Sequence, residues 1–281
     1  MTVPQDGEQH TQVLQRTRKI DMCALIPRDA LAQVAPVLEV NNPGPSSCSA
    51  ALTVSTTMMT SIGLDWGADV SGTPRPGDSP ELTYSPDGTT IGTNRQTCLA
   101  FGSFPAGASL WLTVQAPQDT EPCAVAKKLL PGAVRRWMAE PPQGSSADTK
   151  PSKLLGMDPC EIATRLGAQP SQAPAQPGSL WRCAFRYRDH DVSVAYDYGQ
   201  EKVMAQDGTV VQTGSRTIYH SNLPLGPADW SYEAAVGPTT GTPTPMAWLG
   251  SYVPVVKVVA ESDDSGEVGA DLMRQTLALF P

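Results

Sequence analysis

Six cysteines are the residues of this 281-residue chain whose spacing most clearly indicates chemistry. Taken in order along the chain, they form three pairs, each about 25 residues apart, a spacing that suits disulfide-closed loops. Six cysteines permit about 15 pairings, so the spacing alone does not assign the bonds. The residues are Cys23, Cys48, Cys98, Cys123, Cys160 and Cys183.

An internal repeat narrows the choice of pairing. The stretch IDMCALIPRDALAQV at 20–34 resembles GMDPCEIATRLGAQ at 156–169, and SSCSAALTV at 46–54 resembles WRCAFRYRD at 181–189. The segment 98–134 resembles 247–280, where both of its cysteines are missing together, as a bonded pair would be. The repeat therefore predicts three disulfides, which join Cys23 to Cys48, Cys98 to Cys123 and Cys160 to Cys183.

The remaining candidates for chemistry are weak. No CxxC motif occurs, and His10, His190 and His220 lie far from the cysteines, so we expect neither a metal site nor a cofactor. His190 is flanked by Asp189 and Asp191, but in a strand these carboxylates point to the opposite face. His220 precedes a serine that lacks the GxSxG surroundings of a nucleophile. No catalytic residue is predicted.

Three residues stay as candidate ligand contacts. His190 and His220 are two of them, and Trp66 is the third because its glycine-rich segment, GLDWGADVSG, predicts a loop that exposes the indole. Trp111, in contrast, lies in a strand-like run and is expected in the core.

The elements that must position these residues predict an α+β fold. Each repeat reads helix, several alternating strands, helix, which indicates two tandem domains, each an antiparallel β-sheet with packed helices and disulfide staples. Asp21 and Asp158 are expected to cap the opening helices. The predicted organisation is a disordered tail at 1–17, a first α+β repeat at 18–138, a Pro- and Ser-rich linker at 139–153 and a second repeat at 154–281.

Composition restricts the partners and the compartment. The formal net charge of -8 and the pI of about 4.9 argue against nucleic-acid binding. No apolar run reaches the roughly 20 residues of a membrane span, and the polar start MTVPQDGEQHTQ lacks the core of a signal peptide. Because disulfides form in oxidising compartments, we expect an extracytoplasmic protein, secreted or anchored at the cell envelope, whose anchor or signal segment has been removed.

The motifs around the first cysteine of each repeat resemble those of a known family. DMCALIPRDAL with CSAALTV, and MDPCEIATRLG with CAFRY, are similar to actinobacterial envelope lipoproteins of unknown function and to extracellular sensor domains of actinobacterial membrane proteins, including serine/threonine kinases. The first repeat departs from this pattern at Met22, where proline is typical. The resemblance implies an envelope location and a ligand- or partner-binding role, and it implies no active site.

These observations favour a non-catalytic binding or sensor module. Its expected partners are an envelope protein, a cell-wall fragment or a small apolar ligand, bound in a groove between the repeats. Two alternatives belong to other classes: a hydrolase that acts on the envelope, and a structural subunit of an envelope or secretion complex. A histidine within hydrogen-bond reach of a carboxylate and a serine would favour the hydrolase, and an apolar cleft would favour the ligand binder.

Overall fold

The computed structural model of the chain describes most of its residues and two compact units. The described residues are 7–53, 61–70, 72, 77–87, 95–171, 179–200, 203–205, 209–213, 216–222, 230–238, 252–261 and 266–281. The first unit comprises Met1–Lys150 with Pro174–Leu180, and the second comprises Pro151–Ala173 with Trp181–Pro281.

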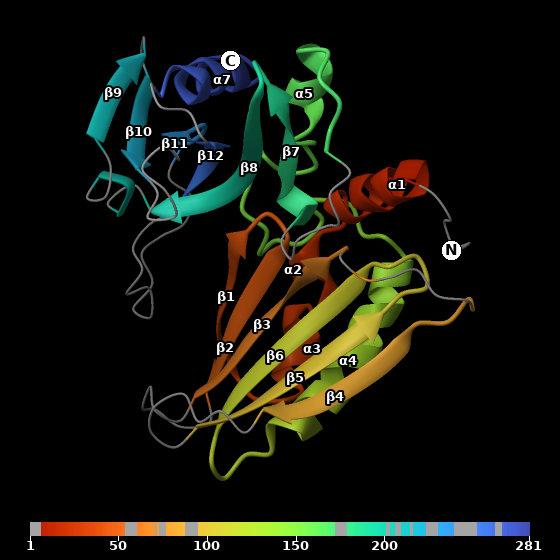
Figure 1. The fold of residues 1–281 in the computed structure, drawn as a ribbon. Helices are drawn as coiled ribbons and strands as arrows, with labels where there is room; N and C mark the ends of the chain where they lie inside the picture. Colours follow the sequence, from red (N-terminus) through yellow and green to blue (C-terminus); the bar gives the residue numbers. More distant parts are fainter. Residues whose placement is uncertain are drawn as a thin grey trace. The chain divides into compact units, whose positions relative to one another are not determined.

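The first unit is built on a six-stranded antiparallel sheet (Figure 1). Its strand order is β1-β2-β3-β6-β5-β4. The bounds are β1 Val37–Gly44, β2 Ser47–Thr53, β3 Ser61–Asp69, β4 Glu81–Asp87, β5 Arg95–Ser103 and β6 Ser109–Pro117.

Helices cover one face of this sheet. They are α2 (Met22–Leu25), α3 (Arg28–Ala32) and the 17-residue α4 (Pro122–Met138). The strands alternate accordingly, and every second residue of β6, from Leu110 to Ala116, is buried against the helices. The alternation fixes the register, because a slip of one residue would expose this row to water.

Helix α4 has a capped N-terminus and an internal proline. Glu121 caps it by accepting hydrogen bonds from the amides of Cys123 and Ala124, and Pro122 occupies the first turn, where its missing N–H costs nothing. The helix continues through Pro131 to Met138, although an internal proline removes one backbone hydrogen bond. Leu129, Leu130 and Trp137 are buried, and this packing offsets that loss.

Residues 7–17, expected as part of a disordered tail, are instead helical. They belong to α1 (Gly7–Arg18), which buries Val13 and Thr17. The prediction of a disordered tail was wrong from Gly7 onward. The segment is mostly polar, and the few residues that α1 buries do not stand out in such a composition.

Residues 139–150, expected as the first part of a linker, are tied to the first unit. Asp21 is fully buried and caps α2 at the amide of Ala24, as predicted. The same carboxylate accepts hydrogen bonds from the Ser146 amide at 2.9 Å and from the Thr149 hydroxyl at 2.5 Å. Arg28 makes a salt bridge to Asp148. A buried carboxylate needs these donors, so this Pro- and Ser-rich stretch is ordered structure and the linker prediction was wrong for it.

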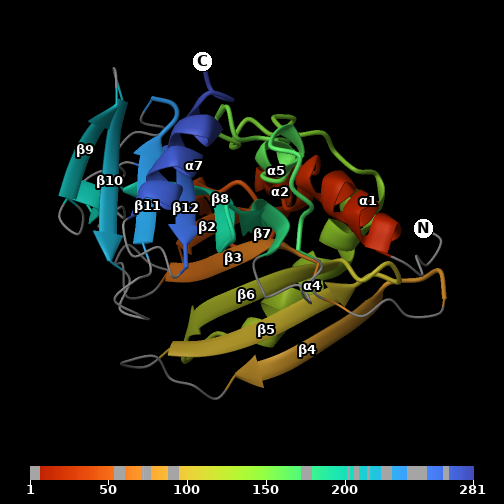
Figure 2. The same ribbon diagram turned by 45° about the horizontal axis from the view of Figure 1, so that its top comes forward.

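The second unit has its own six-stranded antiparallel sheet, in the order β7-β8-β12-β11-β10-β9. The bounds are β7 Arg182–Tyr187, β8 His190–Gln200, β9 Thr209–Thr213, β10 Arg216–Asn222, β11 Trp230–Ala235 and β12 Tyr252–Ala260. Helix α7 (Glu267–Leu277) lies against β11 and β12 (Figure 2). The short α5 (Glu161–Arg165) begins after Cys160, and Asp158 accepts from the Cys160 amide without capping α5 itself.

Five strands of each sheet follow the same order. If the cysteine-bearing strands β2 and β7 are equated, the order β2-β3-β6-β5-β4 corresponds to β7-β8-β12-β11-β10. In the first unit β1 adds an outer strand beside β2, and among the described residues of the second unit a bridge between Pro170 and Phe185 lies at that edge. The second unit adds β9 at the opposite edge, beside β10.

The α+β prediction holds in its coarse form. The chain contains two antiparallel sheets, packed helices and three disulfides, with more strand (44%) than helix (27%). Among the described residues, no helix has the length and apolar character needed to cross a membrane.

Candidate functional site

The three disulfides have the pairing that the repeat predicted. Cys23–Cys48 joins α2 to β2, Cys98–Cys123 joins β5 to the first turn of α4, and Cys160–Cys183 joins the residue before α5 to β7. The Cα–Cα distances are 5.2, 5.2 and 5.1 Å, inside the usual range for a disulfide. The cysteines therefore staple helices to sheets and leave no thiol for catalysis.

Trp66 is not a ligand contact. The segment predicted as a loop is strand β3, and the Trp66 side chain is completely buried. Its Nε1 donates a hydrogen bond of 2.7 Å to the carbonyl oxygen of Met22, next to the Cys23–Cys48 disulfide. Glycines suggested a loop here, but Gly67 serves close packing instead, since a Cβ on it would lie 2.6 Å from the Trp111 ring.

His190 stands at the end of a tight hairpin. It pairs with Tyr187 across a two-residue turn whose residues, Arg188 and Asp189, have φ angles of 49° and 67°. Two consecutive positive φ angles are typical of a type I′ turn. Asp191 is exposed and lies 3.7 Å from Arg186. Asp189 lies in the turn and not in a strand, so the alternation expected for Asp189 and Asp191 does not apply to Asp189.

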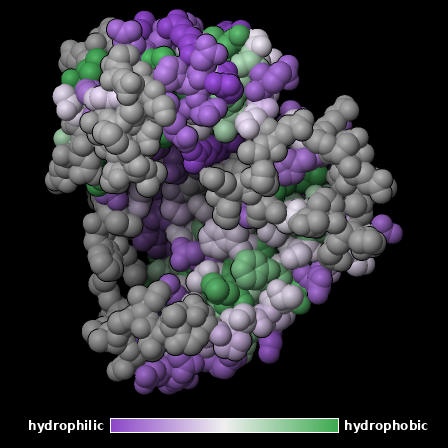
Figure 3. Space-filling model, in the orientation of Figure 1, coloured by the Kyte–Doolittle hydropathy of each residue, from purple (hydrophilic) through white to green (hydrophobic). Residues whose placement is uncertain are grey.

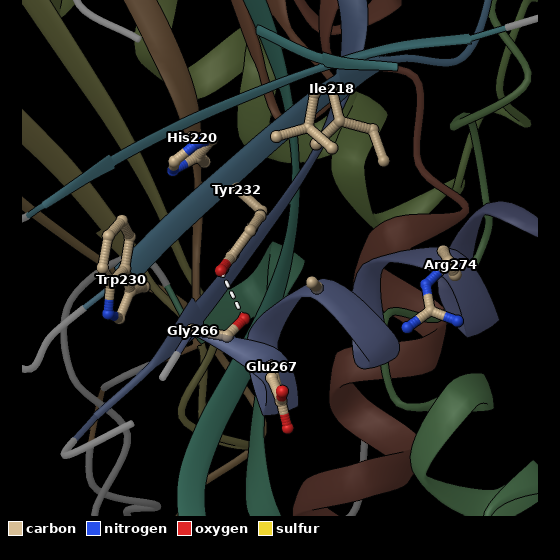
Figure 4. A pocket seen from close by; sticks show the side chains of 9 residues that line it. Ile218, His220, Trp230, Tyr232, Gly266, Glu267 and Arg274 are labelled. Atoms are coloured by element: carbon tan, nitrogen blue, oxygen red, sulfur yellow. Dashed lines mark hydrogen bonds between the residues drawn. The ribbon is translucent and has the colours of Figure 1, made fainter. Parts of the chain in front are cut away.

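His220 lines a pocket within the second unit (Figure 4). The pocket has a volume of about 290 Å³ and lies between the sheet and α7. The strands supply Val211, Ile218, His220, Trp230 and Tyr232, and the helix side supplies Gly266, Glu267, Ala270 and Arg274.

The strand wall of the pocket is set by register. His220 on β10 lies directly opposite Tyr232 on β11, and Trp230 is its diagonal neighbour. The imidazole centroid is 5.4 Å from the Trp230 ring and 5.8 Å from the Tyr232 ring. Three aromatic rings thus share one corner of the pocket, an arrangement that suits a flat apolar ligand.

Two buried polar atoms at this corner have no hydrogen-bond partner among the described residues. They are Nδ1 of His220 and Nε1 of Trp230. Buried nitrogen atoms are ordinarily paired, so these two depart from the usual pattern. The Tyr232 hydroxyl is already used, because it donates to the carbonyl oxygen of Gly266 (Figure 4).

The helix wall of the pocket places two opposite charges near its edge. Glu267 and Arg274 are both exposed, and they lie two turns apart on α7, about 10 Å along its axis. Arg274 is held by the buried Asp271, whose carboxylate also accepts from the Tyr187 hydroxyl at 2.6 Å and from Arg188 at 2.9 Å. The guanidinium is therefore oriented while more than half of the side chain stays accessible.

The expected hydrolase arrangement is not found among the described residues. No hydrogen bond there joins His220 to a carboxylate or a serine. Ser221 follows His220 in β10 and points to the other face of the sheet. In the same part of the chain, no group of histidine, cysteine or acidic side chains could hold a metal ion.

Sequence reasoning found His220 but missed its neighbours. Trp230, Tyr232, Ala270 and Arg274 are far from it in the chain and converge only through strand pairing and the seating of α7. The available signal was the alternation of residues 218 and 220 and of residues 230 and 232. Each of these pairs places two side chains on one face of a strand.

Comparisons with protein-family models, with curated proteins and with solved structures found no match to this chain.

Proposed function

We propose that the chain is a non-catalytic, extracytoplasmic binding or sensor module of the cell envelope, and that the second unit holds a small aromatic ligand. The observation that carries the proposal is the pocket of about 290 Å³ with three aromatic rings in one corner. Its volume is at the lower end of the range for small-molecule sites. A ligand of one or two fused rings has that size.

The charges near the pocket favour an acidic group on the ligand. The guanidinium of Arg274 is oriented by Asp271 and remains accessible, so it can pair with a carboxylate. Glu267 lies two turns away on α7 and would oppose an acid placed at its end of the pocket. These charges predict an aromatic carboxylate whose ring packs beside His220 and whose acid points toward Arg274.

The location in the envelope rests on the sulfur chemistry. All six cysteines are paired, which is typical of proteins that fold in an oxidising compartment. The resemblance of the two cysteine motifs to actinobacterial envelope lipoproteins and sensor domains supports the same compartment.

Calorimetric titration with indole-3-acetate and with the neutral indole-3-ethanol tests the proposal. We expect both probes to bind with one site, and the acid to bind about tenfold more tightly because it pairs with Arg274. Arg274→Ala should remove the advantage of the acid, whereas Ala270→Phe should fill the pocket and abolish binding of both probes.

Val210→Ala is the matched control. Val210 lies on β9 beside the pocket residue Val211, but it points away from the pocket and is 51% exposed. This variant should bind both probes as the unmodified protein does. If neither probe binds, or if Ala270→Phe leaves the affinity unchanged, the pocket is not the ligand site.

A further inference from the structure

The first sheet has one face on which its helices pack and a second face that they leave uncovered. The second face is called the open face here. It is formed by alternate residues of β2, β3, β6, β5 and β4. In the view of Figure 1 the strands pass in front of α4, and Figure 3 shows apolar and weakly polar residues gathered over them in that orientation.

Strand register arranges the open face in rows. One row crosses the sheet through Ser47, Gly67, Trp111, Phe101 and Thr83. The next row crosses through Ser49, Asp65, Thr113, Leu99 and Ser85. Five strands at a spacing of about 4.8 Å make each row about 19 Å long.

Two aromatic side chains lie side by side in the first row. Trp111 and Phe101 are directly paired across β6 and β5. Gly67 makes room for the indole, because a Cβ at that position would lie 2.6 Å from the ring. Phe101 is 37% exposed and Trp111 is half-buried, which corrects the expectation that Trp111 belongs to the core. The row therefore offers water a flat aromatic surface.

The second row supplies hydrogen-bonding groups. The Ser49, Thr113 and Ser85 hydroxyls lie along it together with the exposed carboxylate of Asp65. The surrounding sheet displaces water from Asp65 and raises the pKa of its carboxyl group. A partly desolvated carboxylate is a strong acceptor for hydroxyl donors.

Charge excludes acidic polymers from this face. Asp65 is negative, and the guanidinium of Arg95, at one end of the face, already donates to the carbonyl oxygens of Ser61 and Gln115. The whole chain carries a formal charge of -8. Among the residues of the two rows, an acidic polymer would meet the Asp65 carboxylate and no cationic side chain.

We propose that the open face binds a neutral carbohydrate chain. A sugar ring has apolar C–H faces that can cover the Trp111 and Phe101 rings, and equatorial hydroxyls that can donate to Asp65 and the serine and threonine hydroxyls. An apolar protein surface would instead bury these hydroxyls and the Asp65 carboxylate without partners. The alternation of an aromatic row with a hydroxyl row therefore fits a polyhydroxylated chain.

Binding to soluble oligosaccharides tests this proposal independently of the pocket. The probes are hexamers of β-1,4-linked N-acetylglucosamine, glucose and mannose, with heparin as the acidic polymer. Titration is followed by tryptophan fluorescence and calorimetry. We expect at least one neutral hexamer to bind and to shift the emission, and heparin not to bind.

Surface variants localise the interaction. Phe101→Ala and Asp65→Asn should each weaken binding about tenfold, and Phe101→Trp should retain it because an aromatic face is kept. The control is Met138→Ala, at the end of α4, where the side chain is 46% exposed on the helix side. The proposal is overturned if no neutral hexamer binds, if heparin competes, or if Phe101→Ala and Asp65→Asn bind as tightly as Met138→Ala.

Discussion

The two sheets share a five-strand order. The helix that follows the last strand, α4 in the first unit and α7 in the second, is held to its sheet by different contacts. In the first unit the Cys98–Cys123 disulfide bonds β5 to the first turn of α4. In the second unit Trp230 and Tyr232 of β11 lie against Gly266 and Gly269 at the start of α7, and the Tyr232 hydroxyl donates to Gly266. The first turn of the helix is therefore attached to the sheet by a disulfide in the first unit and by aromatic packing in the second.

The aromatic contact at the start of α7 adjoins the pocket of the second unit. The rings that lie against the start of α7 in the second unit also form the pocket wall beside His220. In the first unit the corresponding strand carries a cysteine, and Gly102 lets Val134 of α4 approach closely, with a Cβ at Gly102 only 2.6 Å from it. A close approach between helix and sheet thus occurs beside the disulfide in the first unit and beside the aromatic contact in the second, where it adjoins the pocket.

The outer faces of the two sheets differ as well. The first carries Asp65 and the paired aromatic rings. The second carries the salt bridge between Lys257 and Glu233, with an N–O distance of 2.7 Å, and Asp197 close to both charges. The outer faces of two sheets with the same strand order therefore differ in their surface chemistry.

The largest effect is expected from removing the disulfide that only the first unit has at this place. Cys98→Ala with Cys123→Ala should lower the free energy of unfolding by about 3 kcal/mol, the chain-entropy value for a loop of this length. Hydrogen exchange followed by mass spectrometry should show faster exchange in α4 and β5. The same double substitution at Cys160 and Cys183 should instead accelerate exchange in α5 and β7. Unchanged exchange in α4 would show that packing alone holds this helix.

Gly269→Ala should disturb the aromatic contact in the second unit. A Cβ at this position would lie 2.4 Å from the Tyr232 ring, which is held by its hydrogen bond to Gly266. Overpacking of this kind should cost about 1–2 kcal/mol after the gain in helix propensity, as measured by urea denaturation.

Gly132→Ala in α4 is the matched control for this substitution. Its Cβ would meet the flexible ends of Arg136, at 3.3 Å, and of Arg135, at 3.8 Å, so a gain of about 0.5–1 kcal/mol is expected from helix propensity. If Gly269→Ala and Gly132→Ala changed the free energy of unfolding equally, the tight contact proposed for α7 alone would be contradicted.

The smallest effect concerns the two carboxylates on the outer faces. Both side chains are exposed, yet partial desolvation by the surrounding sheet raises the pKa of Asp65 and of Asp197. For Asp197 the Tyr198 amide and Lys257 act to lower the pKa, and Glu233 acts to raise it. A raised pKa means that the folded state binds more protons than the unfolded state between the two pKa values. Stability therefore falls as pH rises from the ordinary aspartate value of 3.8 through the folded value.

Asp65→Asn should thus stabilise the protein slightly at neutral pH and have no effect below the ordinary aspartate pKa. Asp197→Asn should stabilise it less, because it gives up the attraction of Lys257. Thermal unfolding at pH 3 and pH 7 separates the two cases. If Asp197→Asn stabilised the protein more than Asp65→Asn at pH 7, the expected order of the two carboxylates would be wrong.

The sequence predicted the parts of the fold that local patterns encode. The repeated cysteine motifs predicted the pairing of the disulfides, and the strand-like run around Trp111 predicted β6. Strands β1 and β3 were missed because Asn42, Pro43, Gly63 and Gly67 are typical of loops, and in the structure these residues tolerate pairing because the neighbouring strands supply the packing. Trp66 was misplaced for the same reason.

The pocket could be predicted only in part. His220 was a candidate from its residue type, but its meeting with Tyr232 depends on the register of β10 with β11, and the position of Arg274 depends on how α7 seats on the sheet. Both are long-range outcomes of packing that no short stretch of sequence specifies. The open face was missed because Trp111 alternates as a core residue would.

The buried carboxylate of Asp21 has a consequence for dividing this chain. A fragment cut after residue 138 would keep Asp21 but lose Ser146 and Thr149, two of its three hydrogen-bond donors. Each hydrogen bond lost from a buried carboxyl group costs about 1–3 kcal/mol, a large fraction of the stability of a small domain. A proline- and serine-rich stretch that looks dispensable is thus needed for the first half to fold, and any boundary for expressing that half alone must lie beyond Thr149.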